Sequence, residues 1–198
     1  MQVSSDWCLW SWVMTLQWAA RWAWPYLAEE PRRVGVLALR LYIIRHGKAY
    51  VDSPTGRDED RELKSRGREQ AEHLGTLLRD SSHRPTLILS SPVSRAAETA
   101  RLINERVAAT LEVRDGLSTA GDERGAFAEI QRVANGDSVA VVGHNPTLET
   151  LVAILCRPAS AEFDGLRTGQ CVVIDFDGLM GPRLGRFVES LRLGSQDD

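Results

Sequence analysis

The chain has few cysteines, and their positions exclude two classes of protein. It contains three, Cys8, Cys156 and Cys171, spread over 198 residues. Scattered cysteines cannot form the disulfide framework of a small secreted domain, and these lack the paired spacing of a structural zinc site. We therefore expect buried free thiols in a reducing compartment, which favours a cytoplasmic protein. No motif in the sequence indicates a metal or a cofactor.

A strong excess of one charge is also lacking. The chain carries 24 basic and 27 acidic residues, for a net charge of -3. Such a balance provides no overall field that would attract nucleic acid or an anionic membrane surface. We expect no nucleic-acid partner, and any basic binding site has to be a local cluster of side chains.

Tryptophan is absent after residue 24, although six tryptophans lie within residues 1–24. This break in composition predicts an N-terminal extension and linker over residues 1–38 and a main domain over residues 39–198. The uncharged run Trp7–Ala20 is too short to span a bilayer and lacks the basic start of a signal peptide. Three interpretations of the extension stay open. The first is an appended segment without a role in the domain, for example upstream sequence included through a wrongly assigned start. The second is a helix that binds a membrane surface or a partner protein, and the third is an extension that packs on the domain.

From Leu41 onward, short β-branched runs alternate with longer segments of helical period, which is typical of an α/β domain. Helices are predicted for residues 64–79, 92–108, 122–134 and 146–156, and strands for residues 41–45, 86–90, 111–113, 138–143, 171–176 and 185–193. The polar stretch 47–62 is predicted to be a long functional loop. We predict a three-layer αβα sandwich with a mostly parallel central sheet.

Three of the predicted strands end on charged or imidazole side chains. The strand "LYII" leads into Arg45 and His46, and "VAVVG" leads into His144. After "LILSS", Arg95 lies near the start of the next helix, for which Ser91 is the predicted N-cap. Asn145 is the predicted N-cap after His144. The carboxyl ends of parallel strands open at one rim of a sheet, so these side chains are expected to lie together.

Arginines, histidines and helix N-termini at one rim predict a site for a small anion. Guanidinium groups bind phosphate oxygens in a bidentate manner, and sulfate or carboxylate would use the same donors. Two imidazoles favour chemistry over simple binding, because a neutral imidazole nitrogen can attack phosphorus and hold the phosphoryl group. The positive side chains would stabilise the transferring group without a metal.

The segments "LYIIRHGKA", "SSPVSRAAETA" and "VVGHNPTLETL" resemble, in this order, the three signature segments of the histidine phosphatase superfamily, which has the phosphoglycerate-mutase-like fold. Within that superfamily, the compact chain and the stretch "DEDRELKSRGREQAEHLGTLL" resemble the SixA-type phosphohistidine phosphatases. The resemblance implies that His46 is the nucleophile. It also implies that Arg45, Arg95 and His144 form the phosphate pocket.

The charged loop also resembles a family pattern, which falls on Asp58, Arg61, Leu63 and Gly67. The resemblance implies that Arg61 reaches the phosphate, with Asp58 orienting it or meeting the leaving group. The alternative is an exposed, solvated charge run.

The general acid that larger members of the superfamily carry is not evident. Candidates are Asp115, Asp122 and Glu123, of which Asp122 matches the SixA-like pattern best. Asp122 would equally serve as the N-cap of the third helix. A phosphorylated imidazole can be protonated near neutral pH before it leaves, so a site without a strong acid favours phosphohistidine over phosphate esters.

The predicted function is a metal-independent phosphatase for phosphohistidine on a signalling or phosphotransfer protein. The alternatives are a broad phosphomonoesterase of the same fold and, in another class, a non-catalytic module that binds a phosphorylated ligand. Membrane contact through the tryptophan-rich segment stays open, and oligomeric state is not predicted.

Overall fold

The computed structural model describes residues 39–134, 138–156 and 163–194. The predicted extension and linker over residues 1–38, with the tryptophans and Cys8, lie outside the described residues. The domain boundary at residue 38 therefore stays a prediction. Among the described residues, no helix is long and apolar enough to cross a membrane.

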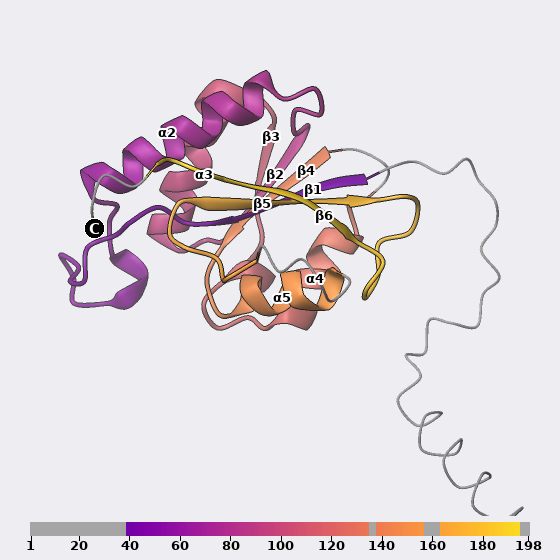
Figure 1. Cartoon of the computed structure of the whole chain (residues 1–198). Coiled ribbons are helices and arrows are strands. Elements are labelled where there is room, and N and C mark those ends of the chain that lie inside the picture. Colours follow the sequence, from indigo (N-terminus) through magenta and orange to yellow (C-terminus); the bar gives the residue numbers. More distant parts are fainter. Residues whose placement is uncertain (1–38, 135–137, 157–162, 195–198) are drawn as a thin grey trace, which may run out of the picture. The chain divides into compact units, whose positions relative to one another are not determined.

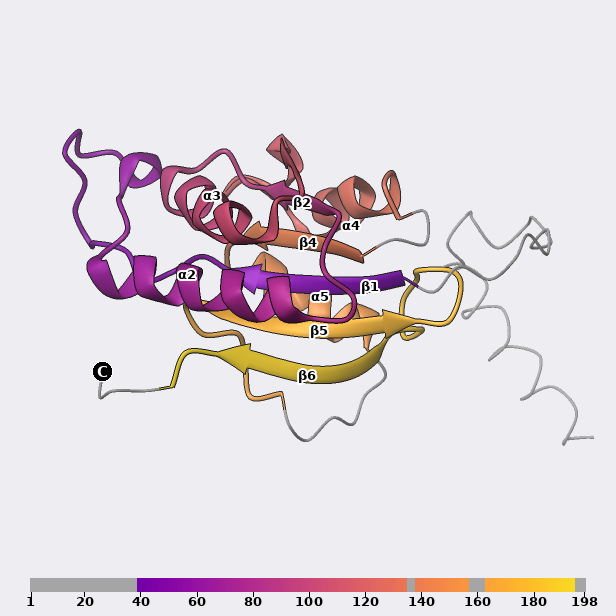
Figure 2. The same ribbon diagram turned by 90° about the horizontal axis from the view of Figure 1, so that it is seen from above.

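A six-stranded sheet forms the centre of the described part, in the order β3-β2-β4-β1-β5-β6. Its strands are β1 (Leu39–Arg45), β2 (Leu87–Ser90), β3 (Thr110–Val113), β4 (Ser138–Gly143), β5 (Gln170–Phe176) and β6 (Arg186–Arg192). The first four are mutually parallel, whereas β5 runs antiparallel to both β1 and β6. In Figure 2, β1 and β4 point the same way and β5 points the opposite way.

The helices lie on both faces of this sheet, with α2 (Ser65–Asp80) and α3 (Ser94–Val107) on one face and α4 (Glu123–Gln131) and α5 (Thr147–Leu155) on the other (Figure 1). Alternate residues of β1 divide between the two cores, as the period of a strand requires. Leu41 and Ile43 pack with α4 and α5, and Tyr42 and Ile44 pack with α2 and α3. The predicted three-layer αβα sandwich is confirmed.

Several predicted details differ from the structure. The third helix ends at Gln131 rather than near residue 134. The second and fourth helices begin later than predicted, at Ser94 and Thr147. Asn145 does not cap the fourth helix: Pro146 is at the N-cap position, and the Asn145 Oδ1 that would accept has no partner among the described residues. The amide nitrogen of Asn145 donates to the Leu166 carbonyl.

Two glycines let the loop after β1 lie directly against the start of α2. A Cβ added to Gly47 would come within 2.4 Å of the Gly67 carbonyl oxygen, and one added to Gly67 within 2.2 Å of the Lys48 carbonyl oxygen. Backbone atoms cannot move aside as a flexible side chain can. The glycine of the "RHG" triplet is therefore needed for a close approach of two backbone segments.

We expect Gly67→Ala to lower the free energy of unfolding by about 3 kcal/mol, since the new methyl group would overlap backbone. Denaturant unfolding measures the change. Gly125→Ala is the control, because the nearest atom to its added Cβ is 3.4 Å away and alanine favours a helix. Equal stability of the two variants would contradict this account of Gly67.

Candidate active site

His46 lies just beyond the end of β1, and its ring is held by the neighbouring backbone. It is 8% exposed, and its Nδ1 lies 2.8 Å from the Gly47 carbonyl oxygen. A carbonyl oxygen can only accept a hydrogen bond, so Nδ1 carries the proton. Nε2 is then left with its lone pair, and Arg95 Nε donates to it at 3.3 Å.

His144 follows β4 and lies beside His46, with the two ring centroids 5.1 Å apart. The parallel register of β1 and β4 explains the juxtaposition, because Arg45 pairs with Gly143 at the ends of the two strands. His144 Nε2 lies 2.9 Å from Ser91 Oγ, while its buried Nδ1 has no partner among the described residues.

Ser91 contributes a contact that the sequence did not predict. Its Oγ accepts from the Val93 backbone N–H, as a turn before a helix requires, and this leaves its own proton able to reach His144 Nε2. That arrangement would place the His144 ring proton on the unpartnered Nδ1. The predicted capping role of Ser91 is wrong, because α3 begins at Ser94 with Val93 at its N-cap position and no side-chain capping hydrogen bond. The sequence "SSP" before a helix carries no signal for the contact with His144.

Arg95 lies in the first turn of α3 with its side chain buried. It donates from Nη1 to the Asp58 carbonyl at 2.7 Å and from Nη2 to the Asp58 carboxylate at 3.0 Å. Asp58 also accepts from Arg61 Nη1 at 2.8 Å, and Arg61 Nε donates to the Tyr50 carbonyl. The charged loop therefore does reach the rim, through two arginines that share one carboxylate.

Arg45 points from the strand end toward the segment before β5. Its Nη1 donates to the Leu166 carbonyl at 2.9 Å, and its buried Nε has no partner within the described part of the chain. The Leu166 backbone is held in turn by Glu149 of α5, whose carboxylate accepts from the Leu166 N–H. Unpartnered nitrogens on Arg45 and His144 are typical of a site that awaits a ligand.

The electrostatics favour neutral imidazoles at the rim. Burial lowers the pKa of His46 to about 4, with the nearby Arg95, Arg45 and Arg61 acting in the same direction. Burial and then His46 lower the pKa of His144 to about 3. The Arg61 and Arg95 guanidiniums lower the pKa of Asp58. An ionised Asp58 is a poor proton donor at neutral pH.

We predict that the proton NMR signal of His46 titrates near pH 4 in phosphate-free protein, rather than near the usual 6.5. Added phosphate should raise this pKa, because a bound dianion offsets the arginine charges. The missing signal in a His46→Ala spectrum gives the assignment. An NMR titration midpoint near pH 6.5 in the phosphate-free protein would contradict the burial argument.

The lowered pKa of His46 also makes stability depend on pH. Between pH 6.5 and pH 4 the imidazole binds a proton in the unfolded chain but not in the folded protein, so the free energy of unfolding should fall as pH falls through that window.

The general-acid candidates lie in the region between η3 (Asp115–Leu117) and α4. The Asp122 carboxylate accepts from the Gly125 backbone N–H at 2.8 Å, so it caps α4. Asp115 begins η3, and Glu123 begins α4. The capping interpretation of Asp122 is confirmed, and its role as a proton donor stays a prediction.

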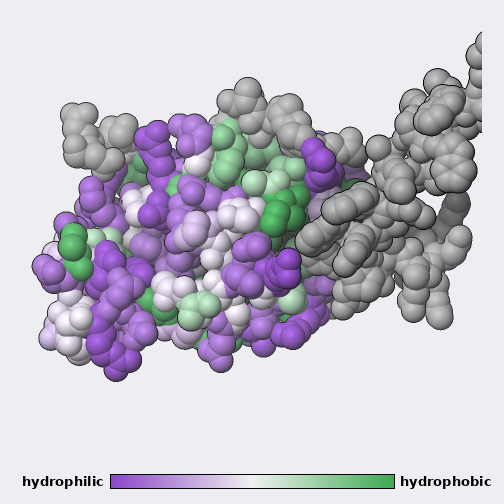
Figure 3. All heavy atoms as spheres, turned by 90° about the horizontal axis from the view of Figure 1, so that it is seen from below, coloured by the Kyte–Doolittle hydropathy of each residue, from purple (hydrophilic) through white to green (hydrophobic). Residues whose placement is uncertain are grey.

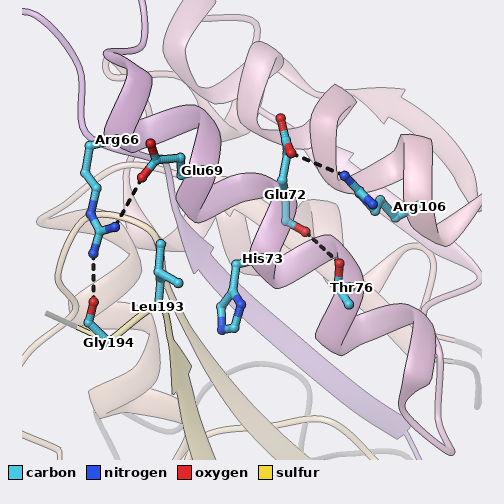
Figure 4. A pocket seen from close by; sticks show the side chains of 8 residues that line it. All are labelled: Arg66, Glu69, Glu72, His73, Thr76, Arg106, Leu193 and Gly194. Carbon is cyan, nitrogen blue, oxygen red and sulfur yellow. Dashed lines mark hydrogen bonds and ion pairs between the residues drawn. The ribbon is translucent and has the colours of Figure 1, made fainter. Parts of the chain in front are cut away.

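A separate surface cavity of about 680 Å³ lies between α2 and the end of β6 (Figure 4). Its charged side chains are paired with one another, Arg66 with Glu69 and Arg106 with Glu72. His73 lines this cavity and has the helix-face position that its place in α2 predicts.

Among the described residues, no group of three His, Cys, Asp or Glu side chains could hold a metal ion. On the face shown in Figure 3, hydrophilic side chains predominate and apolar ones form small separate areas.

Comparisons with known proteins agree with the motifs and the fold. Residues 41–121 match the model of the histidine phosphatase superfamily (branch 1). No curated protein matches the chain. A structure assigned as the phosphohistidine phosphatase SixA from Nakamurella multipartitia is 26% identical, with a TM-score of 0.66 over 78% of this chain and 95% of that chain. A structure assigned to SixA from Agrobacterium tumefaciens is 29% identical, with a TM-score of 0.64 over 77% of this chain and 96% of that chain.

The protein histidine phosphatase SixA in complex with tungstate is 25% identical, with a TM-score of 0.67 over 77% of this chain and 96% of that chain. An α-ribazole-5′-P phosphatase from Escherichia coli, at 22% identity and a TM-score of 0.55, shares the fold alone. The family match and the shared fold together confirm the resemblance of this chain to the histidine phosphatase superfamily, and to SixA-type proteins within it.

Proposed function

We propose that this protein is a phosphatase in which His46 accepts the phosphoryl group, and that its substrate is phosphohistidine on a signalling or phosphotransfer protein. The observation that carries the proposal is the state of the His46 ring. Its Nδ1 proton is committed to the Gly47 carbonyl, so the Nε2 lone pair faces Arg95 and the rim. A buried imidazole fixed in this tautomer is a nucleophile at neutral pH.

The transfer needs two steps. The imidazole of the phosphohistidine substrate first takes a proton from solvent on its other ring nitrogen. His46 Nε2 then attacks phosphorus as the bond from phosphorus to that imidazole breaks, and the imidazole departs with the electron pair as a neutral ring. Water then attacks phosphorus, the bond from phosphorus to Nε2 breaks, and inorganic phosphate leaves with His46 restored. The Gly47 carbonyl stabilises the charge that develops on the ring, as it accepts from Nδ1–H throughout.

Hydrogen-bond donors at the rim, the charged arginines and the neutral His144, would stabilise the phosphoryl oxygens. Arg45 and His144 each have a buried nitrogen without a partner, and Arg95 and Arg61 form the other side. Preorganised donors of this kind are usually the largest contribution to transfer of a charged group. They supply the stabilisation that a metal ion gives in other phosphatases, so the proposed reaction needs no metal.

The choice of phosphohistidine rests on the proton that the leaving group needs. The candidate donors are poorly suited, since Asp58 is ionised by its arginine neighbours and Asp122 is engaged as a helix cap. An alkoxide requires a strong acid, whereas an imidazole of pKa about 6.5 can be protonated before it leaves. The likeness to proteins described as SixA phosphohistidine phosphatases supports the same choice.

The test is a substrate panel with a phosphohistidine protein, free phosphohistidine, 3-phosphoglycerate and glucose phosphates, compared by kcat/KM. We expect the phosphohistidine substrates to be hydrolysed fastest. Equal or faster turnover of the esters would identify a broad phosphomonoesterase. Binding of all substrates without turnover would identify a non-catalytic phospho-ligand module.

A further inference from the structure

The buried guanidinium of Arg95 uses all three of its nitrogens within the protein. Nε donates to His46 Nε2, Nη1 to the Asp58 carbonyl and Nη2 to the Asp58 carboxylate. All three nitrogens have a partner, although Nη1 and Nη2 each keep a second N–H. A phosphoryl group that binds Nη2 on the side where the Asp58 carboxylate lies has to replace that carboxylate.

The Asp58 carboxylate occupies the place of an anion between two arginines. One oxygen lies 3.0 Å from Arg95 Nη2, and the other lies 2.8 Å from Arg61 Nη1. Two oxygens of one phosphoryl group would use the same pair of donors, because a carboxylate and a phosphate present their oxygens at similar spacing to a guanidinium. The two exposures differ: the Asp58 side chain is 58% exposed, whereas that of Arg95 is 6% exposed.

We propose that Asp58 is a built-in occupant of the phosphate site, and that the substrate phosphoryl group displaces its carboxylate from Arg95 and Arg61. This inference rests on the proposed function, since it assigns the two arginines to the phosphate. It differs from the role that the family pattern suggests for Asp58, because here the carboxylate competes with the phosphate instead of orienting the arginine for it.

The loop that carries Asp58 has the construction needed for such an exchange. Its base is closed by the bridge between Ala49 and Leu63 and by the Tyr50 N–H donating to the Glu62 carbonyl. Asp58 begins the short helix η2 (Asp58–Asp60), which contains no buried residue. A cavity of about 350 Å³ lies beside it, lined by residues that include Val51, Gly56, Asp58 and Arg61. The carboxylate can therefore move outward while the base of the loop stays closed.

The competition has consequences for selectivity. A phosphoryl dianion has more charge and more oxygens than the carboxylate it replaces, so it can displace Asp58, whereas a weaker anion such as acetate cannot do so efficiently. The apparent affinity for any anion is the intrinsic affinity multiplied by the fraction of molecules in which Asp58 has released the arginines. The binding of inorganic phosphate, the product, would be weakened in the same way, and weaker binding favours its release.

The test is the affinity for inorganic phosphate, measured by calorimetry at fixed pH and ionic strength. Asp58→Asn keeps the size of the side chain and removes its charge. We expect it to tighten phosphate binding roughly three- to tenfold, the range for losing exposed ion pairs that compete with a ligand. The control is Asp60→Asn, which removes the same charge two residues away, where Asp60 accepts from Thr55 Oγ1 instead. It should leave the affinity within about twofold, since exposed charges at longer range are screened.

Unchanged or weaker phosphate binding by Asp58→Asn would overturn the inference, because Asp58 would then be holding the arginines in place for phosphate. Absence of phosphate binding in both the wild type and this variant would also overturn it. Asp58→Ala, checked for an unchanged melting temperature, repeats the comparison without the amide. The proposed function is tested separately by phosphoryl transfer to His46. A wild type that becomes phosphorylated at His46, combined with no gain in Asp58→Asn, would contradict the inference alone.

Discussion

Replacement of His46 by alanine is expected to lower kcat/KM for a phosphohistidine substrate by roughly 10³- to 10⁵-fold, the range for loss of a nucleophile. His144 is the other imidazole at the rim, and we do not expect it to replace His46, because its Nε2 lies 2.9 Å from Ser91 Oγ. Binding of inorganic phosphate should change far less, since the arginines proposed to hold the phosphate oxygens remain. Steady-state kinetics and phosphate calorimetry on the same preparation separate the two effects.

The matched control is His83→Ala, because His83 is exposed and lies in the turn after α2. This variant should keep kcat/KM within about twofold, as surface substitutions usually do. A His46→Ala variant that retained most of the wild-type activity would show that the nucleophile is another group.

Arg95→Ala is expected to reduce kcat/KM by roughly 10²- to 10³-fold, through a lower kcat and a higher KM together. The guanidinium contacts both the nucleophile and the proposed phosphate position, so its loss removes binding and transition-state stabilisation at once. Arg95→Lys keeps the charge without the planar fork, and we expect it to recover only a small part of the activity. Kinetics over a range of substrate concentrations measure kcat and KM separately.

Arg101→Ala controls for changes in α3, because Arg101 lies on the same helix and pairs with Glu105 at the surface. It should have nearly wild-type kinetics. Full recovery of activity by Arg95→Lys would contradict the bidentate role, and an effect on KM alone would contradict a role in transfer.

The parts of the site that could be predicted from sequence are those fixed by strand ends. "LYIIRHG" and "VAVVGH" are apolar runs followed at once by histidines, and a parallel sheet brings the ends of such neighbouring runs to one rim. His46 and His144 accordingly lie 5.1 Å apart. The helices and strands followed from hydrophobic period in the same way, with boundaries a few residues in error.

The contacts that could not be predicted depend on loops and on carbonyl groups. Asp58 meets Arg95 across 37 residues of sequence, and Ser91 meets His144 across 53. No local pattern encodes such distances. The first contact follows from how the loop after β1 folds back on α3, and the second from the pairing of β2 with β4. The Leu166 carbonyl, which accepts from both Arg45 and Asn145, has no signal in the identity of its side chain. Asn145 was expected as a helix cap for its residue type alone, but it does not cap the helix and its amide nitrogen donates to this carbonyl.

The central claim is that His46 carries the phosphoryl group during the reaction. The direct measurement is rapid quenching of wild-type protein in alkali during turnover of a phosphohistidine protein, followed by mass spectrometry of its peptides, because phosphohistidine survives alkali and is lost in acid. The account predicts an added phosphate on the peptide that contains His46, and its absence in His46→Ala. Phosphate found on another residue, or turnover of labelled substrate with none found on His46 at any quenching time, would contradict the account.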